Sequence, residues 1–400
     1  NDVQAIAVKT LGVLLTIVQE EQVMQIADSL ADQVLDASKN ELRDVYAIGL
    51  RTLIKTIPST LGDVTSSRLV GRLLEGVRST SEEIVLSCLD ILTDLLARFG
   101  ATSLSVARQH EPILQICLQQ LSNNAAPVIR KRAGNTLGCL SVVLSDALLV
   151  SMVQRLLTQI DLADGLGKAG RRKAKEQKQA SGITGEAGDT RALIRTMCIV
   201  SGAVGHRLQQ EQIDRILPIF FRFTDPEDAI TGDDEFDDDD DDDGMDEGFD
   251  PDDEAAIALA NELRESCFMG FESFVLRCPT QVQPHLQSII EASLAYMSYD
   301  PNYSYGVDDD EADGDGDEEF EDDEEEDEFE DDDEDDDDDD DESWKVRRSA
   351  IRALSAIVSS QRNNPSPLWT EEHKVRKGKS SIMAQALVDR FKEREENCRV

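Results

Sequence analysis

The stretch PVIRKRAGNTLG, residues Pro127–Gly138, has the pattern of a helix that packs through one face. A proline opens it, an arginine follows soon after, and small and large apolar residues then recur at helical spacing. Proline suits the first turn of a helix, where its missing N–H costs nothing, and the spacing gathers the apolar side chains on one side. The stretch therefore predicts an amphipathic helix that needs a neighbour to cover its apolar face.

The same pattern occurs in three stretches nearer the N-terminus. The four stretches begin at Val3, Leu42, Ile84 and Ile129, carry Ala7, Tyr46, Cys88 or Ala133 four positions later, and carry Leu11, Leu50, Leu92 or Leu137 eight positions later. Their starts are 39, 42 and 45 residues apart, and second helical patterns such as residues 21–35 and 110–121 lie between them. Two helices per roughly 40 to 47 residues is the period of HEAT and armadillo repeats, whose units bury their apolar faces by stacking.

The period widens beyond Gly138. The next anchors, near Leu193, at Leu263 and at Val346, are 64, 70 and 83 residues apart. Each long gap contains one low-complexity stretch, and subtracting about 25, 28 and 38 residues for these stretches restores spacings within the repeat range. We therefore expect the repeat to continue with three enlarged loops.

The predicted fold is all-α, a HEAT-repeat α-solenoid with disordered acidic inserts. Its segments are HEAT repeats over 1–164, a basic and glycine-rich loop over 165–189, a repeat over 190–225, an acidic insert over 226–254, a repeat over 255–303, an acidic disordered insert over 304–342, and truncated repeats over 343–400. Because patterned sequence runs to both ends, we expect the chain to be a piece of a longer protein.

The acidity of the chain comes from two of these inserts. The formal net charge is −43, but Asp308–Glu342 holds 30 acids and Asp233–Glu254 another 16, with no lysine or arginine in either. Of 83 acids, 37 remain for the rest of the chain, against 40 bases. Repulsion among the carboxylates predicts disorder in the inserts, and a longer flexible loop adds only about 0.6 kcal/mol per doubling of its length.

The sequence offers little for catalysis or for a cofactor. The histidines are far apart, without a second ligand at helical spacing; they are His110, His206, His285 and His373. The seven cysteines include no C-x-x-C pair and fit reduced, buried positions; they are Cys88, Cys117, Cys139, Cys198, Cys267, Cys278 and Cys398. Gly165–Lys168 lacks the rest of a phosphate loop, and no G-x-S-x-G elbow occurs. We therefore predict no enzyme, no cofactor, no metal and no small-molecule substrate.

Other ligand classes are weaker alternatives. Calcium binding by the acid runs would be diffuse, because they lack the residue order of an EF-hand. The basic stretch Gly167–Gln179 is either a solvated loop or an element for nuclear localisation or acidic ligands. Nucleic acid is disfavoured as the main ligand because the acid runs repel phosphates. No apolar run is long enough for a membrane span and no signal peptide is visible, so we expect a cytoplasmic and nuclear protein without membrane partners.

Specific strings resemble the N-terminal part of the cullin-associated, neddylation-dissociated protein family. They are YMSYDPNYSYG followed by acids and then SWKVRRSAIRALSAIVSS, with GHRL at Gly205–Leu208, ESFVLRCP at Glu272–Pro279 and RFKEREEN at Arg390–Asn397. The resemblance implies a solenoid that wraps the C-terminal region of an unmodified cullin and its RING subunit. It further implies an exchange factor that loosens substrate-receptor modules and opposes attachment of the ubiquitin-like modifier.

Residue assignments follow from the same resemblance. Its matched strings supply six candidate partner-binding residues: Lys345, Arg347, Arg348, Arg390, Lys392 and Arg394. The first three directly follow the acid tract, and their position favours neutralising its end as their role over contacting a partner. Trp344, Val346 and Leu354 have the spacing of core residues. The alternative function is a HEAT-repeat carrier or chaperone of basic cargo, importin-like or histone-binding, because acid tracts on a solenoid also suit such cargo.

Overall fold

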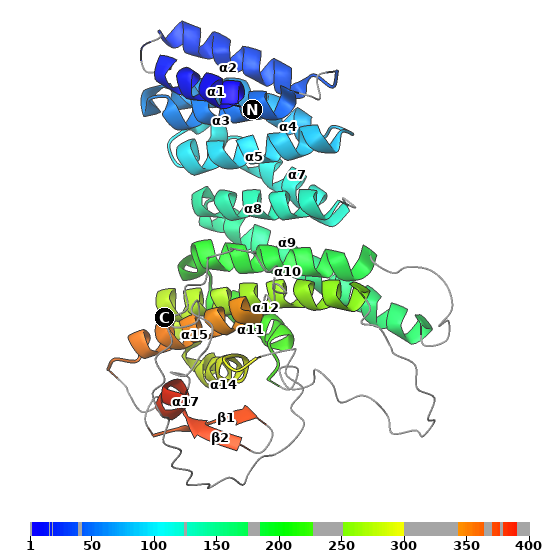
Figure 1. Ribbon diagram of the computed structural model, residues 1–400, viewed down its shortest axis with the longest axis vertical. Helices are drawn as coiled ribbons and strands as arrows, with labels where there is room; N and C mark the ends of the chain where they lie inside the picture. Colours follow the sequence, from blue (N-terminus) through cyan, green and yellow to red (C-terminus); the bar gives the residue numbers. More distant parts are fainter. Residues whose placement is uncertain are drawn as a thin grey trace, which may run out of the picture.

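The chain forms a stack of helices in two rows, drawn from top to bottom in Figure 1. The computed structural model describes residues 2–15, 17, 19–38, 42–123, 126–174, 185–226, 251–299, 343–363, 370–376 and 379–389. Consecutive helices of each row contact one another, and each second-row helix also packs on the first-row helix that follows it in sequence. This arrangement is the paired-helix stack that the sequence predicts.

The first row holds the helices that contain the predicted anchors. It comprises α1 (Asp2–Leu14), α3 (Arg43–Thr56), α5 (Glu82–Phe99), α8 (Pro127–Val143), α10 (Gly185–Val204), α12 (Pro251–Arg277) and α15 (Ser343–Ser360). The anchors Cys88, Ala133 and Val346 are fully buried, and Leu193 is 3% exposed. Ala7 is exposed, because α1 has only α3 beside it in the described part of the row.

The second row supplies the other helix of each pair. It comprises α2 (Glu20–Leu35), α4 (Gly62–Val77), α7 (His110–Asn123), α9 (Asp146–Ala174), α11 (Gln210–Phe223) and α14 (Leu286–Tyr296). Short helical turns join some of the pairs: η2 (Ser59–Leu61), α6 (Leu104–Ala107), η3 (Gly205–Arg207), α13 (Pro279–Val282) and η4 (Gln283–His285).

Polar contacts between neighbouring repeats reproduce the repeat period. Arg43 Nη1 lies 2.5 Å from Glu83 Oε2 across 40 residues, and Arg155 Nη2 donates to Glu111 Oε1 at 2.9 Å across 44. The equivalent bond from Arg352 Nη2 to Glu272 Oε1, 3.0 Å long, spans 80 residues. The sequence separation of the two partners doubles where an insert intervenes, but the contact is still an arginine–glutamate ion pair between neighbouring helices.

The enlarged loops occupy one type of connection. Residues 175–184, 227–250 and 300–342 each lead from a second-row helix to the next first-row helix, and all three lie outside the described residues. The predicted disorder of the inserts therefore stays a prediction. Their expected bounds differ from the helix ends, since α9 continues to Ala174 and α12 already begins at Pro251.

A small hairpin follows the last stacked pair, where the sequence predicts only helical repeats. Strands β1 (Glu372–Arg376) and β2 (Lys379–Ile382) pair antiparallel, and α17 (Met383–Asp389) follows directly. In β1 the residues Glu372 and Lys374 are exposed while His373 between them is 1% exposed, the alternation of a half-buried strand. The strand packs on α14 and covers the end of the second row.

Candidate partner-binding surfaces

The described residues contain little of the chemistry that an enzyme or a metal protein uses. Among them, no group of three or more histidine, cysteine and acidic side chains is placed to hold a metal ion, and no helix is long and apolar enough to cross a membrane. Six cysteines are free thiols, five of them buried, and burial raises the pKa of Cys88 and Cys117 to about 12. Cys398 lies outside the described residues.

Three of the predicted partner-binding residues lie on α15, in different environments. Arg347 is 8% exposed, and its Nη1 donates to the carbonyl oxygen of Tyr299 at 3.0 Å and to Ser343 Oγ at 2.8 Å. Lys345 is half-buried, with its ammonium 5.8 Å from the Trp344 ring centre. Arg348 is exposed. The three side chains thus do not form one patch, and Arg348 presents its charge to solvent.

The other three predicted residues, Arg390, Lys392 and Arg394, lie outside the described residues. Their roles stay predictions.

Arg347 and Arg264 fasten the two ends of the long acidic insert to the stack. Tyr299 is the last described residue before the insert, and Ser343 is the first after it. Arg347 bonds to both, and Arg264 Nη1 donates to Tyr299 Oη at 2.9 Å while its guanidinium lies 5.2 Å from the Tyr299 ring centre. Contacts of the residues on either side of the insert therefore hold α14 and α15 together.

A ladder of charged residues crosses the first row. Asp94 Oδ2 on α5 accepts from Arg51 Nε at 2.6 Å and lies 3.3 Å from Lys55 Nζ, both on α3. Asp90 Oδ1, one turn away, lies 3.2 Å from Arg132 Nη1 of α8. The bond to Asp94 raises the pKa of Arg51, and burial raises the pKa of Asp90. Both carboxylates are paired across helices, so these charges serve stacking; three bases against two acids leave one net positive charge at the surface.

The ladder continues in the second half of the row. Glu262 of α12 pairs with Arg195 of α10 and lies 3.5 Å from Lys131 Nζ of α8. The neighbouring Arg195 lowers the pKa of Lys131, because two cations share one carboxylate. Glu262 also lines a small pocket of about 170 Å³ with Asn261, Glu265 and Lys345. Lys345 thus lies beside Glu262 and Glu265 of α12, so acidic residues of the chain itself balance its positive charge.

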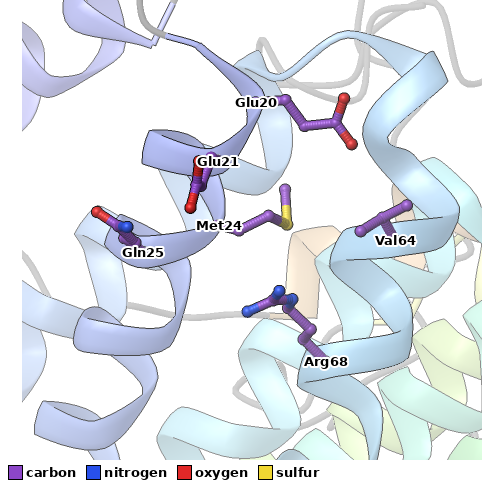
Figure 2. A pocket seen from close by; sticks show the side chains of 6 residues that line it. All are labelled: Glu20, Glu21, Met24, Gln25, Val64 and Arg68. Carbon is purple, nitrogen blue, oxygen red and sulfur yellow. The ribbon is translucent and has the colours of Figure 1, made fainter.

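A pocket lies in the second row, between α2 and α4 (Figure 2). Its volume is about 540 Å³, and its lining is Glu20, Glu21, Met24, Gln25, Val64 and Arg68. Figure 2 shows the Met24 side chain between the two helices, with Val64 facing it and the two glutamates on the α2 side. The sequence pattern of residues 21–35 predicts only the second helix of a pair and does not indicate this pocket.

The comparisons with known proteins agree with this architecture. No family model matches the chain. Two relatives are each 34% identical to it: cullin-associated NEDD8-dissociated protein 2 of Mus musculus, over 403 residues, and protein 1 of Dictyostelium discoideum, over 411. Protein 1 of Drosophila melanogaster is 31% identical over 400 residues. The matches cover 99%, 100% and 99% of this chain and 27%, 28% and 26% of the respective relatives.

Paired helices stacked in two rows define a helical-repeat scaffold, a class of protein that works through its surfaces. Within that class, the chain is homologous over its whole length to part of the cullin-associated NEDD8-dissociated proteins. It spans about a quarter of the length of these relatives. The homology and the stack confirm the predicted HEAT-repeat fold class.

Proposed function

We propose that this chain is the cullin-binding part of an exchange factor. It would embrace the C-terminal region of an unmodified cullin and its RING subunit, oppose attachment of the ubiquitin-like modifier and promote exchange of substrate receptors, in the cytoplasm and nucleus. The observation that carries the proposal is the homology along the whole chain to proteins named for their association with cullins and dissociation from NEDD8. A long two-row helical stack supports it, because such stacks offer extended surfaces to large partners.

Within this proposal, Arg348 is the strongest partner-contact candidate on α15. It is exposed, whereas Arg347 bonds to Tyr299 and Ser343 inside the chain. Lys345 would contribute at the edge of its pocket with Glu265. Arg390, Lys392 and Arg394 complete the proposed set.

The second candidate function is a carrier of basic cargo, such as histones. It is favoured by the two acid runs, Asp233–Glu254 and Asp308–Glu342, which together hold 46 acids and no base. Charge of this density attracts basic proteins and raises their association rate. In this function the acid runs are essential, whereas in cullin binding they would act only as spacers or by steering.

A pull-down with matched variants separates the two functions. The baits are the intact chain, a deletion of 308–342, and a variant with an uncharged Gly/Ser segment of equal length in its place. The prey are a cullin C-terminal region with its RING subunit, unmodified and modifier-conjugated, and histones. Capture of the unmodified cullin alone, by all three baits, is the expected result. Loss of cullin capture in both altered baits, or equal capture of histones by the intact chain, would overturn the proposal in favour of basic cargo.

A further inference from the structure

We propose that the pocket between α2 and α4 binds an apolar side chain of a partner segment that carries lysine or arginine beside it. This site is additional to the α15 residues, and the inference does not require that the partner be a cullin. It rests on three features of the pocket: its apolar floor, the charges at its mouth and the bare backbone beyond it.

The floor of the pocket suits an aliphatic side chain of variable shape. Met24 is 3% exposed and lies under the opening, and Val64 on the facing helix is 40% exposed. A volume of about 540 Å³ is within the range of ligand sites, roughly 300–1,000 Å³. Methionine is flexible and polarisable, so a Met-lined floor accommodates leucine, isoleucine or methionine alike.

The mouth of the pocket is acidic. Glu20 and Glu21 are exposed, and within the described residues neither forms an ion pair. Arg68 does not offset them, because its Nη1 is bonded to Asp28 Oδ2 at 2.5 Å. Arg72, which lies 3.5 Å from Asp28 Oδ1, has Asp32 as a second partner. The mouth therefore complements a cation, which selects a partner whose apolar side chain has basic neighbours.

The site extends along α4 to a bare stretch of backbone at Gly71. Val64, Arg68 and Gly71 are spaced four and three residues apart, so they share one face of the helix. Gly71 is exposed, and a Cβ built on it would meet nothing within 4 Å. Glycine is a poor helix former, and packing within the chain does not require one here. Close approach of a partner backbone across this position accounts for it.

Methyl NMR of the intact chain tests the site. The chain has seven methionines, so ¹³C-methyl labelling gives a simple spectrum in which the variant Met24→Leu assigns Met24. The probe is a capped nine-residue peptide, Gly-Ser-Lys-Lys-Leu-Lys-Lys-Ser-Gly. Matched peptides replace the leucine by serine or the lysines by glutamate. We expect the Met24 signal to move in a saturable titration with the first peptide and not with the other two.

Two variant pairs sharpen the test. The double variant Glu20→Gln, Glu21→Gln should raise the dissociation constant of the probe about fivefold, as expected for exposed charge pairs. Gly71→Leu should weaken binding, whereas Gly202→Leu on α10, where a Cβ also meets nothing within 4 Å, should leave it unchanged. A Met24 signal that stays fixed at millimolar probe, or that moves equally with the acidic peptide, would overturn the proposal.

Discussion

The two halves of the stack solve the same packing problem with different chain lengths and different side chains. From α1 to α9, repeats are joined by short connections, and contacts between them span 40–44 residues, as between Arg68 and Asp28 or Arg155 and Glu111. From α9 onward, equivalent contacts span 54–80 residues, as between Arg215 and Asp161. The helices stack alike in both halves, so contacts between neighbouring repeats determine the fold, and the length of the connection does not.

The cores of the two halves also differ. The first half is filled by aliphatic residues such as Leu50, Leu53 and Leu92, all fully buried. The second half contains a cluster of aromatic rings, in which the buried Phe271 lies 5.8 Å from the buried Phe220 and 5.1 Å from the half-buried Phe221 between ring centres. Large rings bury more area per residue, which offsets the ordering of helices separated by long loops.

The largest expected effect is the loss of a ring from the aromatic cluster. Phe271→Ala should lower the free energy of unfolding by about 3–5 kcal/mol, because it removes a fully buried ring at the centre of three aromatic contacts. Leu92→Ala in the aliphatic half is the matched variant, with an expected loss of about 2–5 kcal/mol. Urea unfolding followed by circular dichroism measures both. A loss below about 2 kcal/mol for Phe271→Ala would contradict the proposed role of the rings.

Adding a methyl group at Gly270 of α12 tests how closely this helix approaches α11. A Cβ on Gly270 would lie 2.6 Å from Phe220 Cε2, so Gly270→Ala should cost about 1–3 kcal/mol through overpacking. The control is Gly71→Ala, where the methyl meets nothing within 4 Å and should stabilise the chain by about 1 kcal/mol through helix propensity. Thermal unfolding of both variants gives the sign directly. Equal effects at the two positions would argue against the tight contact.

The bonds from Arg347 to Tyr299 and Ser343, on either side of the long insert, contribute less to stability than the aromatic cluster. Arg347→Met should cost about 1–3 kcal/mol, because the carbonyl of Tyr299 and the hydroxyl of Ser343 lose a buried donor. Arg348→Met, one residue along the same helix and exposed, should change stability by no more than about 0.5 kcal/mol. Hydrogen exchange of α14 and α15 measures the local effect. Equal protection in the two variants would show that the bonds of Arg347 do not stabilise the contact between α14 and α15.

Much of the stack is predictable from the sequence, because periodic burial leaves a pattern that inserts interrupt without erasing. The anchors Ala133, Leu263 and Val346 lie on first-row helices at buried positions, despite gaps of 70 and 83 residues in the sequence. Even the weakest anchor, near Leu193, lies on α10, where Leu193 and Ile194 are both buried. The pattern survives because each repeat contacts only its neighbours.

Other features depend on contacts that no local pattern records. The burial of Arg347 depends on a carbonyl 48 residues away, across the insert, so the residue looks like a surface arginine in the sequence. The hairpin at 372–382 is short and rich in charge, and its alternation is too brief to distinguish from a loop. The α2–α4 pocket arises from the fit of two helices 40 residues apart, and nothing in either helix alone indicates it.

The smallest expected effect is a dependence of the stability of the first half on pH. His110 begins α7 and is 7% exposed, and burial lowers its pKa below the ordinary value of 6.5. The unfolded chain therefore binds the proton more readily, so stability should fall as pH drops below about 6.5. Urea midpoints between pH 5 and 8 measure the slope, and His110→Gln should reduce it. If the urea midpoint changes with pH as steeply in His110→Gln as in the intact chain, a group other than His110 causes the pH dependence.

Calorimetric titration of an unmodified cullin C-terminal region, with its RING subunit, tests most directly whether the helical surface carries binding. The intact chain and the variant lacking 308–342 should give dissociation constants within about threefold of each other at 0.15 M salt, because acidic charge away from the binding surface affects association rate more than affinity. A loss of affinity greater than about thirtyfold in the deletion variant, roughly 2 kcal/mol, would contradict the account and assign binding to the acidic segment.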